Sequence, residues 1–504
     1  MNIKEAKEQV KYSVISYLSR DEFGDYRIPI ERQRPLFLMG PPGIGKTDIM
    51  SQIANEMDIA LVSYSMTHHT RQSALGLPFI ANKDYDGKEY RTTEYTMSEI
   101  IASVYDVMEE TGKKEGILFL DEINCISETL APSMLQFLQF KTFGRHSVPD
   151  GWIVVTAGNP PEYNNSVRDF DLATLDRLKR MDIEPDFQAW RGYAENEGVH
   201  MAVLTYLEIK KDDFYSVQTT VDGKTFVTAR GWVDLSDMMK LYEQNRLPIS
   251  IDLIRQYIHD ERIARDFSAY YDLFYRFREE YYIEDLLEGQ IREGVIERAK
   301  DSPFDERLTV LRLITDSLNG EFREVYEAGR TIRTLLEIIK KNRDALAGAT
   351  VEEATGLIAG VREGYREELR KGRRSKSMSK EDARLAMAAD HALSELDLWL
   401  RQGSGDPSWT SEGAIRAFLA ERNAERRTKA ERAGARLANA FAFLEQAYTE
   451  EREILIFVTT LTENRYSVDF ISNYGSEAYY RHNKGLLLYE REQDLAKELA
   501  ELEE

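Results

Sequence analysis

A glycine-rich loop directly after a short apolar run is the feature that most constrains this chain. Residues 36–39 predict a buried strand, and a helix-forming stretch follows the loop. The loop itself reads Gly40, Pro41, Pro42, Gly43, Ile44, Gly45, Lys46 and Thr47. Glycines at this spacing let several backbone N–H groups converge on one phosphate, and the next helix N-terminus adds partial positive charge. We therefore expect Lys46 to bind the β- and γ-phosphate oxygens of a nucleotide and Thr47 to hold Mg²⁺.

Two later apolar runs end in polar side chains that suit the same site. Residues 117–120 run directly into Asp121 and Glu122, and residues 153–157 lead to Asn159. Ligands bind at the carboxyl edge of an open α/β sheet, where such strand ends meet. We expect Asp121 to orient Mg²⁺ and Glu122 to polarise the attacking water as general base. The neutral amide of Asn159 is suited to contact both the terminal phosphate and that water.

Apolar runs separated by helix-length stretches predict the fold class. Runs at residues 36–39, 59–62, 116–120 and 152–156 indicate a parallel α/β sheet covered on both faces, within residues 34–186. Residues 1–33 predict an N-terminal helix, over Ile3 to about Leu18, and its lead-in. Residues 187–289 predict a helical lid, with a turn near 221–225 and aromatic residues between Phe267 and Tyr282 at the spacing of a buried helix face.

The remainder, residues 290–504, is rich in helix-forming residues and predicts a large all-α bundle or long helices. A basic linker near 370–380 and a glycine- and serine-containing stretch at 403–408 are both typical of flexible connections. We expect the basic linker to be solvated rather than to contact nucleic acid or an acidic partner. The apolar stretches at 454–458 and 486–489 are suited to pack against the bundle or a partner.

The cysteine content and the net charge indicate the cellular compartment of the protein and the kind of partner that it binds. The chain has 504 residues, a single cysteine, Cys125, and a formal net charge of −22. One cysteine excludes an internal disulfide and a cysteine-based zinc site, in agreement with a reducing compartment. No stretch approaches the ~20 apolar residues that span a bilayer, so we expect a cytoplasmic protein without membrane insertion. The acidic surface disfavours nucleic acid as a partner, although a local basic channel stays possible.

Taken in order, these motifs resemble those of the AAA+ ATPases, and within them the MoxR-like group. The resemblance covers about residues 34–289. It rests on the loop at 40–47, the acidic pair, Asn159, Leu175-Asp176-Arg177-Leu178, Thr228-Ala229-Arg230-Gly231-Trp232 and Leu75-Gly76-Leu77-Pro78. The resemblance implies an AAA+ type P-loop NTPase core that hydrolyses ATP with Mg²⁺. It also implies a homo-oligomer, a hexameric ring, with nucleotide between neighbouring subunits, and chaperone-like maturation of partner complexes, often with von Willebrand factor A domain proteins.

The same resemblance implies roles for three arginines. Arg177 matches the finger that reaches into the neighbouring subunit's site, where a cation stabilises charge on the transferring phosphoryl group. Arg180 lies close enough in sequence to be a second candidate, and Leu178 stands where an aromatic residue usually follows the finger, which leaves the choice open. Arg230 matches the lid arginine that senses nucleotide in its own subunit.

Three functions fit this sequence. The first is an ATP-driven machine that remodels a protein partner through the appended helices. The second is a nucleic-acid-dependent motor of translocase or restriction type, for which Lys141, Arg145 and His146 are the candidates for a basic pore loop. The third is a nucleotide-dependent binding switch with slow hydrolysis. We expect the first, because the set of hydrolytic residues is complete and a large helical region is appended. The acidic surface argues against the second, and the sequence hardly separates the third from the first.

Overall fold

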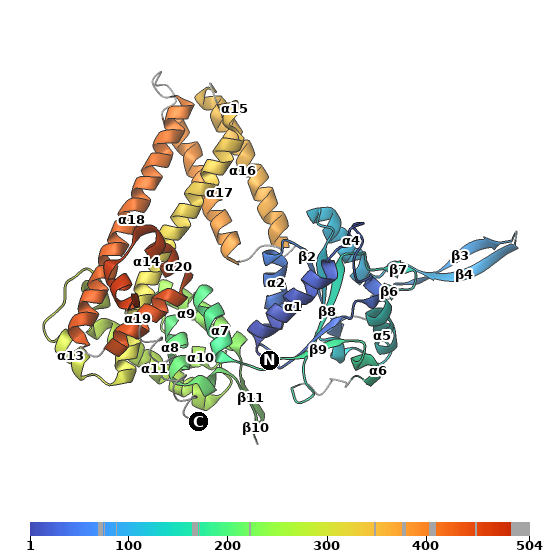
Figure 1. Cartoon of the computed structure of the whole chain (residues 1–504), viewed down its shortest axis with the longest axis horizontal. Helices are drawn as coiled ribbons and strands as arrows, with labels where there is room; N and C mark the ends of the chain where they lie inside the picture. Colours follow the sequence, from blue (N-terminus) through green and yellow to red (C-terminus); the bar gives the residue numbers. More distant parts are fainter. Residues whose placement is uncertain are drawn as a thin grey trace. The chain divides into compact units, whose positions relative to one another are not determined.

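The chain forms two compact units (Figure 1). The computed structural model describes residues 1–68, 74, 76–86, 88–163, 170, 172–220, 223–346, 349–374, 380–402, 410–448 and 451–484. Unit 1 comprises Met1–Trp190, Thr228–Arg230 and Glu367–Ala383, and unit 2 comprises Arg191–Val227, Gly231–Arg366 and Arg384–Glu504. Within the described ranges, none of the helices combines the length and the apolar character that crossing a bilayer requires.

Unit 1 is built on a five-stranded parallel sheet. In spatial order its strands are β2 (Ala60–Ser65), β5 (Gly116–Asp121), β8 (Trp152–Gly158), β1 (Leu36–Met39) and β9 (Lys179–Asp182). The register pairs Ser65 with Asp121 and Met39 with Gly158, so the carboxyl ends of these strands meet at one edge of the sheet. That edge is the ligand-binding edge of an open parallel sheet.

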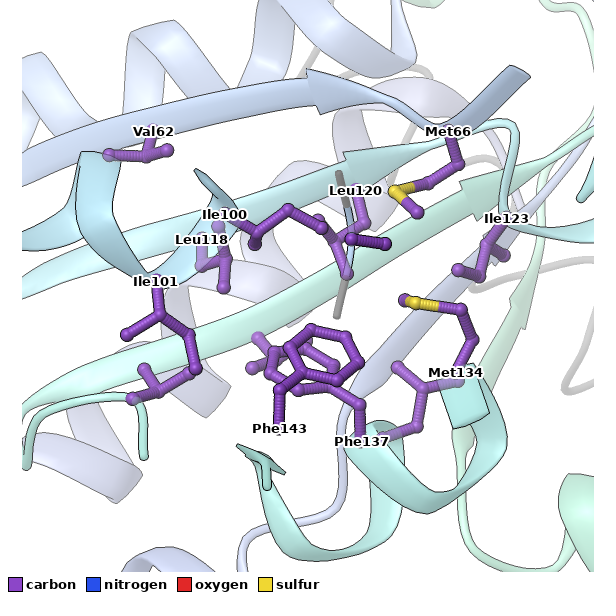
Figure 2. Packing of buried hydrophobic residues seen from close by; sticks show 14 of the residues in the cluster. Val62, Met66, Ile100, Ile101, Leu118, Leu120, Ile123, Met134, Phe137 and Phe143 are labelled. Carbon is purple, nitrogen blue, oxygen red and sulfur yellow. The ribbon is translucent and has the colours of Figure 1, made fainter. Parts of the chain in front are cut away.

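Both faces of the sheet are covered, which explains the continuous apolar runs of its central strands. Strand β8 is buried along its whole length, and β5 is buried up to Leu120. Figure 2 shows the core on one face, where Ile100 and Ile101 lie against Leu118 and other side chains from the sheet. In the same cluster the rings of Phe137 and Phe143 stack with their centroids 4.2 Å apart. This packing fixes the strands whose ends carry the polar residues.

The helices of unit 1 connect the strands, and two hairpins are inserted between them. The helical segments are α1 (Ile3–Leu18), η1 (Ile30–Arg32), α2 (Lys46–Glu56), η2 (Met66–His68), α4 (Glu99–Thr111), η3 (Ile123–Cys125), α5 (Ala131–Phe140), α6 (Leu172–Leu175) and α7 (Phe187–Asn196), which ends in unit 2. The hairpins are β3 (Pro78–Tyr85) with β4 (Lys88–Tyr95), and β6 (Thr142–Phe143) with β7 (His146–Ser147). Helix α1 begins with a capping box, in which Asn2 and Glu5 each accept the other's backbone N–H.

Unit 2 is almost wholly helical. Its elements are α8 (Met201–Ile209), η4 (Lys211–Phe214), the hairpin β10 (Ser216–Thr220) and β11 (Gly223–Val227), α9 (Ala229–Gln244), α10 (Ile251–Ile254), α11 (Glu261–Glu280), α12 (Ile283–Leu287), α13 (Val295–Asp301), α14 (Phe304–Lys341), α15 (Arg343–Leu346), α16 (Val351–Arg374), α17 (Lys380–Gln402), α18 (Ser411–Ala447), α19 (Glu451–Glu463) and α20 (Arg465–Tyr474). The first residues of α9 and the facing ends of α16 and α17 belong to unit 1.

Aromatic packing and buried ion pairs hold unit 2 together. The rings of Tyr206 and Trp232 pack against Phe267 with centroids 5.3 and 5.2 Å away. The nearly buried Arg312 pairs with Glu208, and the nearly buried Arg436 pairs with Glu321. Removing one partner of such a pair leaves a buried charge uncompensated, which is costly. The long helices α14 and α18 run side by side, as Figure 1 shows.

The structure confirms the fold class, the helix over Ile3–Leu18, and strands at all four apolar runs. The aromatic face of α11 is core as predicted at Phe267, Tyr271 and Phe274, which are buried, but the prediction is wrong for Tyr275 and Tyr282, which are 48% and 40% exposed. Strand β9 and the hairpins are additions that the sequence reading did not include, because these short or mostly exposed strands lack continuous apolar runs. Of the basic stretch near 370–380, residues 371–374 belong to α16 and 380 to α17. Residues 375–379, 403–409 and 486–489 lie outside the described residues.

Candidate functional site

The loop at residues 40–47 joins β1 to α2, as the sequence predicts. Gly43 and Gly45 have φ angles of +75° and +94°, a region that glycine adopts without strain. A Cβ on Gly43 would lie 2.9 Å from Cβ of Thr228, and one on Gly40 would lie 2.8 Å from the Ile183 carbonyl oxygen. The loop therefore needs glycine both for its backbone path and for close packing. The N-terminus of α2, whose first N–H groups have no partner within the helix, therefore lies at the carboxyl edge of the sheet.

Lys46 is held inside this loop. Its Nζ donates to the carbonyl oxygens of Gly40 and Pro41 at 2.7 and 2.8 Å, and to Oδ1 of Asn159 at 2.9 Å. The side chain is only 7% exposed. Burial lowers the pKa of Lys46 to about 8, and the charge of Arg230 acts in the same direction, while Asp121 and Glu122 oppose it. The ammonium group thus connects the loop of β1 to the end of β8.

Thr47 and Asp121 form a pair of oxygen donors beside Lys46. The Thr47 hydroxyl donates to Oδ2 of Asp121 at 3.0 Å, and Oδ1 of Asp121 accepts the backbone N–H of Glu122 at 2.9 Å. Hydroxyl and carboxylate oxygens are hard ligands that suit Mg²⁺. Among the described residues no three acidic, histidine or cysteine side chains converge on one point. Mg²⁺ ordinarily takes few protein oxygens and fills its coordination with water and phosphate, so these two donors fit this metal.

Glu122 is held in an unusual backbone conformation at the end of β5. Its φ is +56°, which is uncommon for a residue other than glycine and is often found at functional sites. Its Oε2 accepts the hydroxyls of Ser65 and Thr67, each at 3.0 Å. Both hydroxyls come from the end of β2 and the residues after it. The structure therefore fixes the direction of this carboxylate with two groups that the sequence reading missed.

Asn159 follows β8 and is supported by a second asparagine that the sequence reading also missed. Asn124, 1% exposed, donates its Nδ2 to the Asn159 carbonyl oxygen at 2.8 Å. Its Oδ1 is buried and has no hydrogen-bond partner among the described residues. A Cβ on Gly158 would lie 2.6 Å from that oxygen. Asn124 thus fills the space beside Gly158 and positions the backbone of Asn159, whose side chain accepts from Lys46.

This contact predicts that Gly158→Ala destabilises unit 1. The added methyl must displace Asn124, which is enclosed, and overpacking of this kind costs about 1–3 kcal/mol. We expect a lower thermal midpoint by calorimetry. Gly192→Ala is the matched control, because a Cβ there would meet nothing within 4 Å. The double variant with Asn124→Ala should be less destabilised than the sum of its single variants. Strict additivity would show that the two residues do not interact.

Arg230 also lies at the loop, within unit 1. Its backbone N–H donates to the Gly43 carbonyl oxygen at 3.1 Å, and its side chain is exposed. The guanidinium lies near enough for its charge to lower the pKa of Lys46. The structure therefore brings Arg230 together with the loop at residues 40–47, although some 180 residues separate them in sequence.

Arg177 and Arg180 are not brought to this loop. Both are exposed, and no hydrogen bond or ion pair among the described residues connects either of them to residues 40–47. Arg180 is paired with Asp182 of its own strand, with 2.7 Å between Nη2 and Oδ1. The Arg177 guanidinium makes no such contact within the described ranges. Of the two arginines, Arg177 is thus the one whose guanidinium has no partner among the described residues.

The prediction that Lys141 belongs to a basic pore loop is wrong. This residue is 1% exposed, and its Nζ donates to the carbonyl oxygens of Ile30 and Gln33. Burial lowers the pKa of Lys141 to about 8. Of its two proposed companions, Arg145 pairs with Glu94 at 3.0 Å, and the His146 ring lies 3.4 Å from the Tyr95 carbonyl oxygen. Lys141 is therefore a structural residue that ties backbone carbonyls together.

Cys125, three residues after Glu122, is partly buried. Burial raises the pKa of its thiol, with Glu122 and Asp121 adding to the effect, so the reactive thiolate is disfavoured. Of the Leu75–Pro78 stretch, Leu75 lies outside the described residues. Pro78 is the first residue of β3.

Comparison with known proteins places this site in a family domain. Residues 36–184 match the family described as ATPase family associated with various cellular activities (AAA). The match contains the loop, the acidic pair, Asn159, Arg177 and Arg180, and it ends before Arg230 and the helical unit. No curated protein matches the chain.

Proposed function

We propose that the chain binds ATP with Mg²⁺, hydrolyses it, and uses the cycle to remodel or mature a protein partner. The match of residues 36–184 to the AAA ATPase family supports this proposal. The observation that supports this proposal best is the meeting of three strand ends. Lys46 after β1, Asp121 at the end of β5 and Asn159 after β8 are linked by hydrogen bonds or by charge. A glycine loop that opens a helix is the fourth component.

The residues divide the chemistry among them. Lys46 and the loop N–H groups bind the phosphates, and Thr47 with Asp121 would hold Mg²⁺, which neutralises phosphate charge when bound. Glu122, oriented by Ser65 and Thr67, accepts the proton of the attacking water. The Asn159 side chain, positioned by Asn124, contacts the terminal phosphate and that water.

Isothermal titration calorimetry with ATP and Mg²⁺ tests the binding step. Lys46→Ala removes a charge-assisted contact worth about 1.5–3 kcal/mol, so the affinity should fall by roughly 10- to 150-fold. Lys11→Ala, which removes a surface lysine that pairs with Glu56, is the control and should leave affinity unchanged. No measurable affinity in the unaltered chain, or equal affinity in Lys46→Ala, would refute the proposed site.

The lowered pKa of Lys46 predicts that ATP binding depends on pH. The phosphates require the ammonium form, which predominates below pH about 8 in the chain alone. Binding to triphosphate favours that form, so above this pH each binding event takes up a proton. Affinity should therefore be constant below pH about 8 and fall toward roughly tenfold per pH unit above it. Calorimetry in buffers of different ionisation enthalpy measures the proton uptake. Flat affinity through pH 9.5 would contradict this assignment.

The assembly and the partner are part of the same proposal. The sequence resemblance to the MoxR-like group supports a homo-oligomeric ring and a protein client, with a von Willebrand factor A domain protein as one candidate. The Arg177 guanidinium, which has no partner among the described residues, and the large helical unit 2 support it as well. Lys141 is buried, so one of the three residues proposed for the basic pore loop of a nucleic-acid-dependent motor cannot line a pore. A slow binding switch would show tight ATP binding with turnover that assembly does not accelerate.

A further inference from the structure

A groove lies between the long helices α14 and α18 of unit 2. It encloses about 420 Å³. Its lining includes the apolar side chains of Ile332, Leu336, Leu419 and Ala420. Leu336 is 39% exposed although it belongs to the apolar side of α14. The groove is therefore an apolar surface that the described residues leave uncovered.

Two arginines flank this apolar lining, one from each helix. Arg333 and Arg426 line the groove, and neither guanidinium has a hydrogen bond or an ion pair among the described residues. The Nε–H of Arg426 is buried and has no acceptor in the part of the chain that the structure describes. A Cβ on Gly329 would lie 3.3 Å from Nη1 of Arg426, so the small residue lets this guanidinium lie against α14. Arg422, one turn before Arg426 on α18, does have a partner, Glu395, at 2.6 Å.

This arrangement selects a ligand that carries carboxylates beside apolar side chains. Neither guanidinium is neutralised by a described residue, and arginine binds carboxylates through paired N–H donors. The C-terminal segment 485–504 has this chemistry. Leu495, Leu499 and Leu502 recur at helical spacing, and residues 490–504 contain seven acidic side chains against two basic ones.

We propose that residues 485–504 bind in the groove between α14 and α18, with their leucines on its apolar lining and their carboxylates on Arg333 and Arg426. The segment is tethered within reach. His482 lies 2.8 Å from Glu445 of α18, and Arg426 is roughly 29 Å back along that helix at about 1.5 Å per residue. Extended chain from His482 to Leu495 spans roughly 43 Å. Tethering at about millimolar effective concentration makes even a weak contact sufficient.

The full chain provides the test, because it has a single cysteine. In a Cys125→Ser, Ala500→Cys chain, an environment-sensitive dye on residue 500 reports binding through its anisotropy and emission maximum. We expect a bound signal that Arg333→Glu with Arg426→Glu reduces about tenfold or more. Arg427→Glu, an exposed neighbour outside the groove, is the matched control and should leave the signal unchanged. Circular dichroism confirms that each variant keeps its helices.

Two further measurements test whether the dye signal comes from binding within one chain: charge reversal on both partners, and dilution of the protein. Glu498→Arg with Glu501→Arg should restore the bound signal in the doubly reversed groove, which a general loss of structure would not allow. The signal should not depend on protein concentration. A dye signal typical of free chain, equal effects of Arg427→Glu and the groove variants, or binding that disappears on dilution would overturn the proposal. The last outcome would assign the groove to a second copy.

Discussion

ATP hydrolysis should fall by roughly two to four orders of magnitude when Glu122 is replaced by glutamine, which is the range for loss of a general base. The physical reason is that an amide cannot accept the proton of the attacking water. Glutamine keeps the size of the side chain and can still contact the hydroxyls of Ser65 and Thr67, which hold Oε2 at 3.0 Å in the structure. ATP affinity should therefore persist. Phosphate release measured beside calorimetric binding separates the two effects.

Two controls define what this result means. Glu110→Gln removes an exposed carboxylate of α4 and should not change turnover. Ser65→Ala with Thr67→Ala should lower turnover less than Glu122→Gln does, because the base remains but loses its orientation. Normal turnover in Glu122→Gln would show that another group activates the water, and the assigned role of Glu122 would be wrong.

The sequence was sufficient to predict the central part of this site, for a physical reason. A loop that approaches phosphate needs glycines at fixed positions, and Gly43 and Gly45 do have positive φ angles. Parallel strands carry their carboxyl ends to one edge, so Asp121 and Asn159 had to meet near Lys46 once the strands were recognised. The hydrogen bonds of Lys46 and Thr47 confirm that proximity.

The supporting residues could not be predicted in the same way. Ser65, Thr67 and Asn124 act through contacts between segments that lie far apart in sequence, and small polar residues are common at strand ends and turns. Asn124 gave one weak signal, a polar side chain between apolar residues just after the acidic pair. For Lys141 the sequence predicted a functional role that the structure contradicts. A lysine that donates to buried carbonyl oxygens cannot be distinguished in sequence from a solvated one.

For the helical half of the chain, the sequence predicted the secondary structure but not how the helices pack. Its amphipathic pattern indicates long helices, and α14 and α18 are of that kind. Their partners depend on side chains that come together only in the fold, such as Arg436 with Glu284 and Glu321. Periodicity says which face of a helix is apolar but not which helix covers it. For the same reason, periodicity could not show that Nε of Arg426, in the groove between these two helices, has no acceptor among the described residues.

Replacing Arg177 by alanine should lower the turnover of the assembled protein by roughly 10³- to 10⁵-fold if this residue is the finger that acts on a neighbour's phosphates. Arg180→Ala should have a far smaller effect, because Arg180 is already paired with Asp182 at 2.7 Å in its own strand. Steady-state hydrolysis over a range of protein concentrations measures both variants. Equal losses would leave the finger unassigned between them, and a loss in Arg180→Ala alone would assign it to Arg180.

Mixing two inactive variants distinguishes action on a neighbour from action within one subunit. In a site between subunits, a chain with Arg177→Ala still supplies Glu122, and an adjoining chain with Glu122→Gln still supplies Arg177. Random mixing in equal amounts should leave about a quarter of the shared sites complete, so turnover should return to that order. A finger that acted within its own subunit would leave every site defective, and the mixture would stay inactive. Recovery of activity would therefore establish both the role of Arg177 and the assembly that requires it.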